Sequence, residues 1–502
     1  MADSPLPQRR YNRRMAATHT PNSSTVPFDL AALIDAELPE PGDSLRLHEL
    51  YINPAVVSVL KTIGFDANYV RGEGCYLFDD KGRRYIDCLG GYAVFAAGRN
   101  HPVIRDALRQ AMDLDLPNLP GVGIFRTSGI LARQLVNLMP GANSAIKDPL
   151  DTVFFSNSGA EAIDAAIKHA RIATGRNGLI YCHRAYHGLT MGALSINGNH
   201  EFRDGFGPLL NDTFEIPFND LAALEAALAK GNIAAFITEP IQGKGVNIPA
   251  DDYLAGAAAL CKKHGALFIL DEIQTGVGRT GKMWACEHFG AGAAWTPDIM
   301  VVAKALSGGY VPVSALITRR WIHTKAFPSM NQCARIQTTF GQNDLAMAAG
   351  LATLHVLKSE RIVENAHEIG DYLMNRLREK IGHYEMVKEI RGKGLMIAIE
   401  FGMPRSRTLR MGWDLLHKLD ASLFCQAILM PLMSDHRVLV QVAGHRLDVI
   451  KLIPPLVLTR QDADQIADAF EATVRACHKF PGPAWEVGKR LGGAAMKRFV
   501  PA

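Results

Sequence analysis

The 502-residue sequence lacks a large charge excess, a Cys-x-x-Cys pair and a long apolar run. Its net charge of +4 is too small over this length to indicate a nucleic-acid partner. The clearest apolar runs, such as the one ending at 267–270, have the length of a strand. A membrane-spanning helix needs about 20 such residues. Neither a nucleic-acid-binding protein nor a membrane-spanning protein is therefore expected.

The eight cysteines are scattered along the chain, so neither a disulfide framework nor a metal site is expected. This pattern fits a reducing compartment, and we predict a cytoplasmic protein. Hydrophobic residues make up 48% and charged residues 21%, which is typical of a soluble globular protein. The length favours two or more lobes over one core.

Residues 1–45 are rich in Pro, Ser and Arg and predict a flexible N-terminal extension. Four arginines lie in a stretch where Asp3 is the only acid before Asp29, namely Arg9, Arg10, Arg13 and Arg14. A disordered basic tail is favoured, and a transit peptide stays open as the alternative.

The rest of the chain predicts an α/β protein with a smaller α+β domain. Residues 46–110 hold short strands at 75–78 and 84–86 and form the N-terminal part of the small domain. Residues 111–345 alternate helical patterns with buried runs at 153–155, 235–237, 267–270 and 299–302, as in a parallel sheet. Residues 346–480 return to the small domain with a helix, strands at 394–401 and 438–442, and a second helix.

Ligands of open parallel sheets bind beyond the carboxyl ends of the strands, so the residues there matter most. The run at 153–155 is followed by Ser156-Asn157-Ser158-Gly159-Ala160-Glu161 and a helical pattern. Small residues at a helix start can bind a phosphate through their N–H groups. An ordinary helix N-cap is the alternative.

Two further strand ends carry charged residues. Asp271 and Glu272 follow a very apolar run, where carboxylates need a positive partner or a metal; a helix-capping acid is the alternative. Lys304 follows the run at 299–302, where loss of water would lower its pKa and make it a nucleophile toward carbonyls. A lysine that extends to the surface is the alternative.

One further motif is discounted. Residues 276–281 fit the dinucleotide pattern G-x-G-x-x-G. The first glycine of that pattern must follow the strand directly, whereas residues 271–275 intervene here. A nicotinamide-dependent dehydrogenase is therefore disfavoured.

Taken together, these segments resemble the class III aminotransferases, the ornithine, acetylornithine, 4-aminobutyrate and putrescine group of fold-type I pyridoxal-phosphate enzymes. The likeness runs from about 69 to 459, with FFSNSGAEA, AYHG, TEPIQGKG, LDEIQTGVGRTG, AKALSGG, TTFGQND, RGKGLM and PPLVLT in the family's order. The resemblance implies a large domain with a mostly parallel seven-stranded sheet. It also implies pyridoxal 5'-phosphate as cofactor and no metal.

The resemblance also implies roles for single residues. Lys304 would hold the cofactor as a Schiff base and move the proton, and Asp271 would keep the pyridine nitrogen protonated. Gln274 would reach the phenolic oxygen of the ring, and Tyr186 would stack on the ring. The phosphate would be bound by Ser158, Gly159 and Ala160.

Two other implied roles concern the substrate and a second subunit. Thr339 would bind the phosphate of the neighbouring subunit, which implies a homodimer with shared active sites. Glu239 would lie on the substrate side, where we expect Lys451 to face it. Lys451 stands where ornithine-type members have an arginine that clamps the α-carboxylate, and Gln342 stands where glycine is usual. A lysine offers a point charge in place of a planar two-pronged clamp.

The predicted reaction is a ping-pong transamination. The segment 88–92 resembles the putrescine branch, which favours a terminal amine or its aldehyde (a diamine, an ω-amino compound or a long apolar amine) with an α-amino/α-keto acid pair. An ornithine or acetylornithine aminotransferase, an aminomutase, a decarboxylase, an epimerase and a non-catalytic scaffold stay open as alternatives.

The C-terminal tail, residues 481–502, predicts a basic amphipathic helix. Four cations, Lys489, Arg490, Lys497 and Arg498, stand against the single acid Glu486. Such a helix can make peripheral contact with an anionic membrane. Packing against protein is the favoured alternative, because glycines weaken an isolated helix.

Overall fold

The computed structural model describes residues 28–40, 42–119, 123–142, 148–419, 423–444, 447–479 and 482. The predicted amphipathic tail at 483–500 and the four N-terminal arginines lie outside these residues. The chain divides into two compact units, one ending at Val57 and one beginning at Ser58. The predicted domain boundaries at 110 and 345 stay a prediction.

The first unit contains α1 (Leu30–Glu37) and α2 (Asp43–Tyr51), and α3 (Pro54–Ile63) runs across the boundary between the units. The helix α1 lies within the predicted flexible extension 1–45 and has no buried residues, and the flexibility of this extension stays a prediction. Asp29 stabilises this helix, because its side chain accepts hydrogen bonds from the N–H groups of Ala31 and Ala32.

The second unit is built on a seven-stranded sheet of order β4-β10-β9-β8-β7-β5-β6. Its neighbouring strands are parallel, except that β10 is antiparallel to both β4 and β9. The predicted mostly parallel sheet is thereby confirmed. The strands are β4 (Leu150–Ser156), β5 (Gly178–Cys182), β6 (Thr213–Ile216), β7 (Ile233–Thr238), β8 (Leu267–Asp271), β9 (Ile299–Val302) and β10 (Ser314–Arg319).

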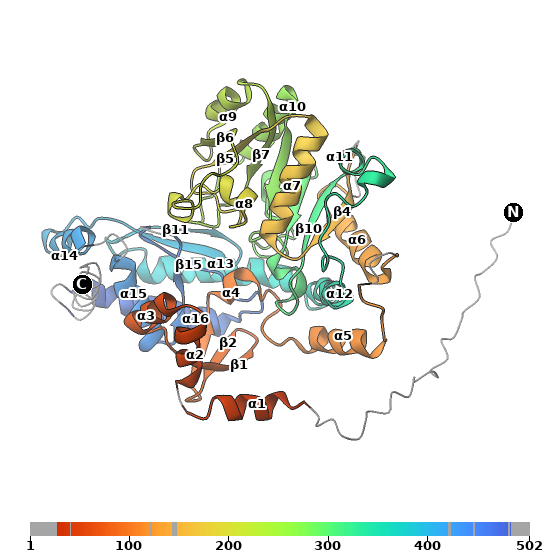
Figure 1. Ribbon diagram of the computed structural model, residues 1–502. Helices are drawn as coiled ribbons and strands as arrows, with labels where there is room; N and C mark the ends of the chain where they lie inside the picture. Colours follow the sequence, from red (N-terminus) through yellow and green to blue (C-terminus); the bar gives the residue numbers. More distant parts are fainter. Residues whose placement is uncertain are drawn as a thin grey trace, which may run out of the picture. The chain divides into compact units, whose positions relative to one another are not determined.

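Both faces of this sheet are covered, which explains why its strands are apolar without alternation. Ile269 and Val301 pack with α7 (Gly159–Thr174) on one face, and Figure 1 shows α7 lying across the strands. Phe268 and Met300 belong to the core on the other face, which includes residues of α10 (Tyr253–His264) and α12 (Asp344–Ser359). Successive side chains thus enter two separate cores.

Two four-stranded sheets complete the unit. In the first, β13 pairs in parallel with β3, so that a late segment of the chain joins an early hairpin. In the second, of order β11-β12-β15-β14, the strands are antiparallel. The strands are β1 (Tyr69–Glu73), β2 (Tyr76–Asp79), β3 (Arg84–Asp87), β11 (Val387–Lys393), β12 (Met396–Phe401), β13 (Val438–Leu439), β14 (Gln441–Val442) and β15 (Val449–Leu452).

The remaining α-helices are α4 (Gly90–Ala93), α5 (Pro102–Asp113), α6 (Arg126–Leu138), α8 (Met191–Ser195), α9 (Leu221–Leu228), α11 (Arg320–Ala326), α13 (Ile362–Ile381), α14 (Arg407–Leu419), α15 (Leu423–Ser434) and α16 (Arg460–Cys477). Short 3-10 helices lie at His200–Phe202, Ala285–Phe289, Lys304–Ser307 and Met330–Gln332. Within the described residues no single helix is long and apolar enough to cross a membrane, and only the bent pair Arg407–Lys418 with Leu423–Ser434 meets the length and composition test jointly.

Two helical glycines allow a matched test of packing. A Cβ on Gly370 of α13 would lie 2.2 Å from the backbone carbonyl carbon of Gly394, whereas a Cβ on the exposed Gly129 of α6 would meet nothing within 4 Å. Gly370→Ala should therefore destabilise the protein by at least ~1–3 kcal/mol. Gly129→Ala should stabilise it by about 0.5–1 kcal/mol. Thermal unfolding at one scan rate measures both, and a Gly370→Ala protein as stable as the parent would contradict this packing.

Candidate active site

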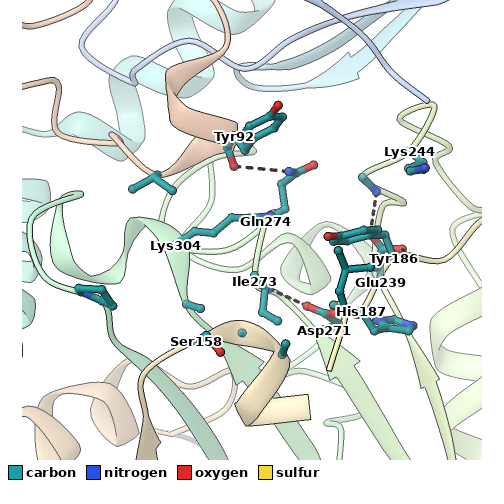
Figure 2. Close-up of a pocket in the computed structure, with 18 of the residues that line it drawn as sticks. Tyr92, Ser158, Tyr186, His187, Glu239, Lys244, Asp271, Ile273, Gln274 and Lys304 are labelled. Carbon is teal, nitrogen blue, oxygen red and sulfur yellow. Dashed lines mark hydrogen bonds and ion pairs between the residues drawn. The ribbon is translucent and has the colours of Figure 1, made fainter. Parts of the chain in front are cut away.

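A cavity of about 1210 Å³ lies at the carboxyl ends of the central strands. It receives residues that follow β4, β7, β8 and β9, as expected for a sheet of this kind. Of the predicted site residues, those that line it together are Ser158, Gly159, Ala160, Tyr186, Glu239, Asp271, Gln274, Lys304 and Lys451. Figure 2 shows most of these side chains around one space.

Asp271 is the last residue of β8 and is buried. One of its carboxylate oxygens accepts a hydrogen bond from the N–H group of Ile273 at 3.0 Å, and the other lies 2.7 Å from Nδ1 of His187. Burial alone would lower the pKa of His187, but the hydrogen bond and charge of Asp271 outweigh burial and raise it. His187 and the Ile273 N–H group therefore hold the Asp271 side chain in the cavity wall.

His187 is the functional residue that the sequence reasoning missed. It belongs to the AYHG segment, in which only Tyr186 received a role. Its Nε2 atom is buried without a hydrogen-bond partner among the described residues. The available signal in the sequence was a histidine shortly after the strand β5. Its closeness to Asp271 could not be predicted, because it depends on the order of the strands in the sheet.

Glu272, next to Asp271, has a separate and structural role. Its buried carboxylate accepts hydrogen bonds from the Thr275 hydroxyl at 2.5 Å and from the N–H groups of Ala285 and Cys286 at 3.1 and 2.8 Å. Ala285 and Cys286 begin a 3-10 helix. The predicted alternative of a helix-capping acid therefore applies to Glu272, whereas Asp271 faces the cavity.

Lys304 lies directly beyond β9 and lines the cavity, so the alternative of a lysine extended to the outer surface is wrong. Burial lowers the pKa of its amine, and the charges of Asp271 and Glu239 oppose that effect in part. Its backbone is left-handed, with φ of 45°, which costs an L-residue about 1–2 kcal/mol. Strain of this kind persists where the surrounding fold fixes a residue.

The N-cap alternative is confirmed at the start of α7, and phosphate binding there stays a prediction. Ser158 is the N-cap, since its hydroxyl accepts from the N–H group of Glu161 at 3.2 Å while the Glu161 carboxylate accepts from the Ser158 N–H group at 3.0 Å. Gly159 and Ala160 then begin the helix on the cavity wall, where first-turn N–H groups attract an anion. A Cβ on Gly159 would lie 2.8 Å from the Ile273 side chain, so glycine is needed for this close approach.

Glu239 lies just beyond β7 and is held by backbone groups. Its carboxylate accepts from the N–H group of Gly243 at 2.8 Å and from that of Tyr186 at 3.3 Å. Burial raises the pKa of Glu239 to about 7, although the nearby His187 lowers it in part. This carboxyl group can therefore be neutral or charged near pH 7.

Lys451 and Glu239 line the same cavity, and the expected effect of Lys451 on substrate selection stays a prediction. The Lys451 amine donates to the Gly243 carbonyl at 2.7 Å and to the Gln274 side-chain oxygen at 3.1 Å. The Gly243 residue separates the two groups, since its N–H bonds to Glu239 and its carbonyl accepts from Lys451. Burial and then the charge of Lys304 lower the pKa of Lys451 to about 7.

Thr339 and Gln342 do not line the cavity of their own chain. Both side chains are exposed at the surface. The predicted phosphate contact of Thr339 with a neighbouring subunit stays a prediction, and so does the effect of Gln342.

Comparison with known proteins adds to this geometry. Residues 60–474 match the family model of Aminotransferase class-III. The chain is 32% identical over 501 residues to Aminotransferase PigE of Serratia sp. (strain ATCC 39006), an alignment that covers 93% of this chain but 57% of PigE. It is 36% identical to the acetylornithine aminotransferase of Bacillus cereus over 398 residues, which cover 79% of this chain and 92% of that protein.

The fold is similar to that of solved aminotransferases. The crystal structure of the ornithine aminotransferase from Toxoplasma gondii ME49 superposes with a TM-score of 0.76 at 29% identity and covers 90% of this chain and 99% of that one. The family match spans the cavity, its lysine and its carboxylates. The chain therefore belongs to the class-III aminotransferases.

Proposed function

We propose that this protein uses pyridoxal 5'-phosphate, held on Lys304, to exchange an amino group between a terminal amine or its aldehyde and an α-amino/α-keto acid pair. The observation that carries the proposal is the convergence of Lys304, Asp271 and the start of α7 on one cavity. Class-III aminotransferases depend on this cofactor, and a second structure of the T. gondii ornithine aminotransferase has it at partial occupancy in the active site.

The residues present fit this cofactor. Its phosphate needs an anion site, which the N–H groups at the start of α7 offer. A positively charged pyridine nitrogen needs a fixed carboxylate, which Asp271 offers with support from His187 and the Ile273 N–H group. Its aldehyde needs an amine, and Lys304 lies in the same cavity. When bound, the cofactor serves as an electron sink for a carbanion.

The chain's own residues would then perform three tasks. Burial lowers the pKa of Lys304 and so raises the neutral fraction of its amine, and a neutral amine can attack a carbonyl or accept a proton at Nζ. The Asp271 carboxylate would stabilise a positive charge on the pyridine nitrogen. Because Asp271 is buried, water would screen this attraction little. Tyr186 and Gln274 border the same space and restrict how a ring and its substituents can be oriented.

The cavity lining supports an amine with an apolar chain as one substrate. Apolar side chains contribute to the wall, including Val94, Leu189, Phe202, Val311, Val313 and Val442. Lys451 offers no planar fork for an α-carboxylate, and its amine is already bonded to Gly243 and Gln274. An ornithine or acetylornithine aminotransferase is the second candidate, because relatives have these names.

A homodimer with shared active sites forms part of the proposal. The exposed apolar side chains include Tyr92 and Leu189, which border the cavity, and Phe340, which is adjacent to Thr339. Apolar groups around a site entrance and beside a predicted partner contact favour burial by a second subunit.

The direct test of the function measures each half-reaction from the cofactor's absorption spectrum. Diamines, ω-amino acids and long-chain amines are compared with ornithine and N-acetylornithine as donors. Lys304→Ala should retain cofactor binding but lose turnover at least about 100-fold, because it removes the amine that carries the cofactor and moves the proton. Turnover at the parent's rate in this variant would refute the assignment.

Adjacent carboxylates provide a matched pair for the role of Asp271. Asp271→Asn should weaken cofactor retention and slow both half-reactions, since an amide cannot keep a pyridine nitrogen protonated. Glu272→Ala should instead lower thermal stability, because two buried backbone N–H groups lose their acceptor, at about 1–3 kcal/mol each. Cofactor content and melting temperature are measured for both. Equal effects of the two changes on cofactor retention would contradict the division of roles.

Subunit mixing tests the trans contribution of Thr339. When Lys304→Ala and Thr339→Ala chains form a heterodimer, one site should receive both changes and the other should be intact. The heterodimer should therefore have about half the activity of the parent dimer, and an equal random mixture about a quarter. Activity no higher than that of the separate variants would refute a shared site.

A further inference from the structure

The cavity needs a cation for the acid substrate, and its lining offers few. Among the described lining residues the only basic side chains besides His187 are Lys304, Lys451 and Lys244. The proposed function, on which this inference rests, assigns Lys304 to the cofactor. It also requires the same cavity to accept a carboxylate-bearing partner in one half-reaction and an amine without a carboxylate in the other.

Lys451 is poorly suited to this task. Its buried amine donates to the Gly243 carbonyl and to the Gln274 side chain. The N–H group of the same Gly243 donates to Glu239, so a substrate carboxylate at Lys451 would approach a second acidic group. Like charges at short distance in a buried site repel strongly.

Lys244 is placed differently. Its amine lies 3.0 Å from a Glu201 carboxylate oxygen and 4.2 Å from the centre of the Phe202 ring. A Cβ on Gly444 would lie 3.4 Å from Lys244 Cδ, so the stem of the lysine packs near this loop. Figure 2 shows Lys244 on the side of the cavity where Tyr186 lies, across from Lys304. The ammonium is thus fixed in the cavity wall, away from Lys304.

We propose that Lys244 binds a carboxylate of the amino-acid and keto-acid substrates, and that Glu201 holds its ammonium when an amine without a carboxylate occupies the cavity. An ammonium has three donors and can exchange one carboxylate for another. Glu201 is 35% exposed, so water can solvate its carboxylate during the exchange. The Lys244 side chain is 14% exposed, so its ammonium needs a carboxylate partner in either state, and the exchange supplies one.

The test compares two half-reactions in the complete enzyme with its cofactor. L-Glutamate and L-alanine serve as donors with a carboxylate, and n-hexylamine serves as the donor without one. Lys244→Met keeps the length of the side chain and removes its charge. It should lower kcat/KM for the amino acids about 10- to 100-fold, the loss expected for one charge-assisted hydrogen bond, and change that for n-hexylamine less than about threefold.

Three further variants separate binding from structure. Lys244→Arg keeps the charge and should retain most of the amino-acid activity. Glu201→Gln removes the competing carboxylate and should lower KM for amino acids, whereas a purely structural ion pair predicts loss toward both donor classes. Lys230→Met is the matched control, because Lys230 also lies over an aromatic ring, 4.7 Å from that of Phe214, but is not among the cavity-lining residues. It should leave both half-reactions unchanged.

The outcomes are distinguishable. If Lys244→Met and Glu201→Gln affect amino acids and n-hexylamine equally, or affect neither, the Lys244 assignment is overturned while the transaminase stands. If none of the amines and amino acids tested converts the cofactor of the parent enzyme, the proposed function itself is overturned.

Discussion

The carboxyl ends of β7, β8 and β9 meet at one edge of the central sheet, and the site depends on this constraint. It places Glu239, Asp271 and Lys304 directly at or beyond those ends, in one cavity. Burial lowers the pKa of Lys304 and raises that of Glu239, while the charges of both carboxylates oppose the effect of burial on Lys304. The result is an amine with a lowered pKa beside a carboxylate that is held by hydrogen bonds, which is the pair of groups that pyridoxal phosphate chemistry requires.

Residues of the same charge in this site have different roles, because each forms hydrogen bonds with different partners. Glu272 is fully engaged by one hydroxyl and two N–H groups and stabilises the fold. Asp271 keeps one face toward the cavity. The two other lysines of the cavity wall also differ in their partners. Lys451 donates to Gly243 and Gln274, whereas Lys244 donates to Glu201. Residue type alone does not distinguish such neighbours.

Much of this site could be predicted from the sequence, since apolar runs locate buried strands and the residues after them locate the site. Asp271, Lys304 and the start of α7 were found in this way. His187 was missed, because its contact with Asp271 requires that β5 and β8 flank β7, and strand order is a tertiary property. The link between Lys451 and Glu239 through Gly243 was not predicted either, since it depends on the path of an intervening loop. The helix α1 was not predicted, because a single capping residue, Asp29, before a short eight-residue helix is a weak signal.

The central claim is that Lys304 is the amine that holds the cofactor, although three lysines line the cavity. The purified protein with its cofactor should be treated with borohydride, which fixes the cofactor to whichever amine holds it, and then digested and analysed by mass spectrometry. The account predicts one modified peptide, in which Lys304 has the reduced cofactor and Lys244 and Lys451 are unmodified. A cofactor fixed on Lys451 or Lys244, or a protein that retains no cofactor, would contradict it.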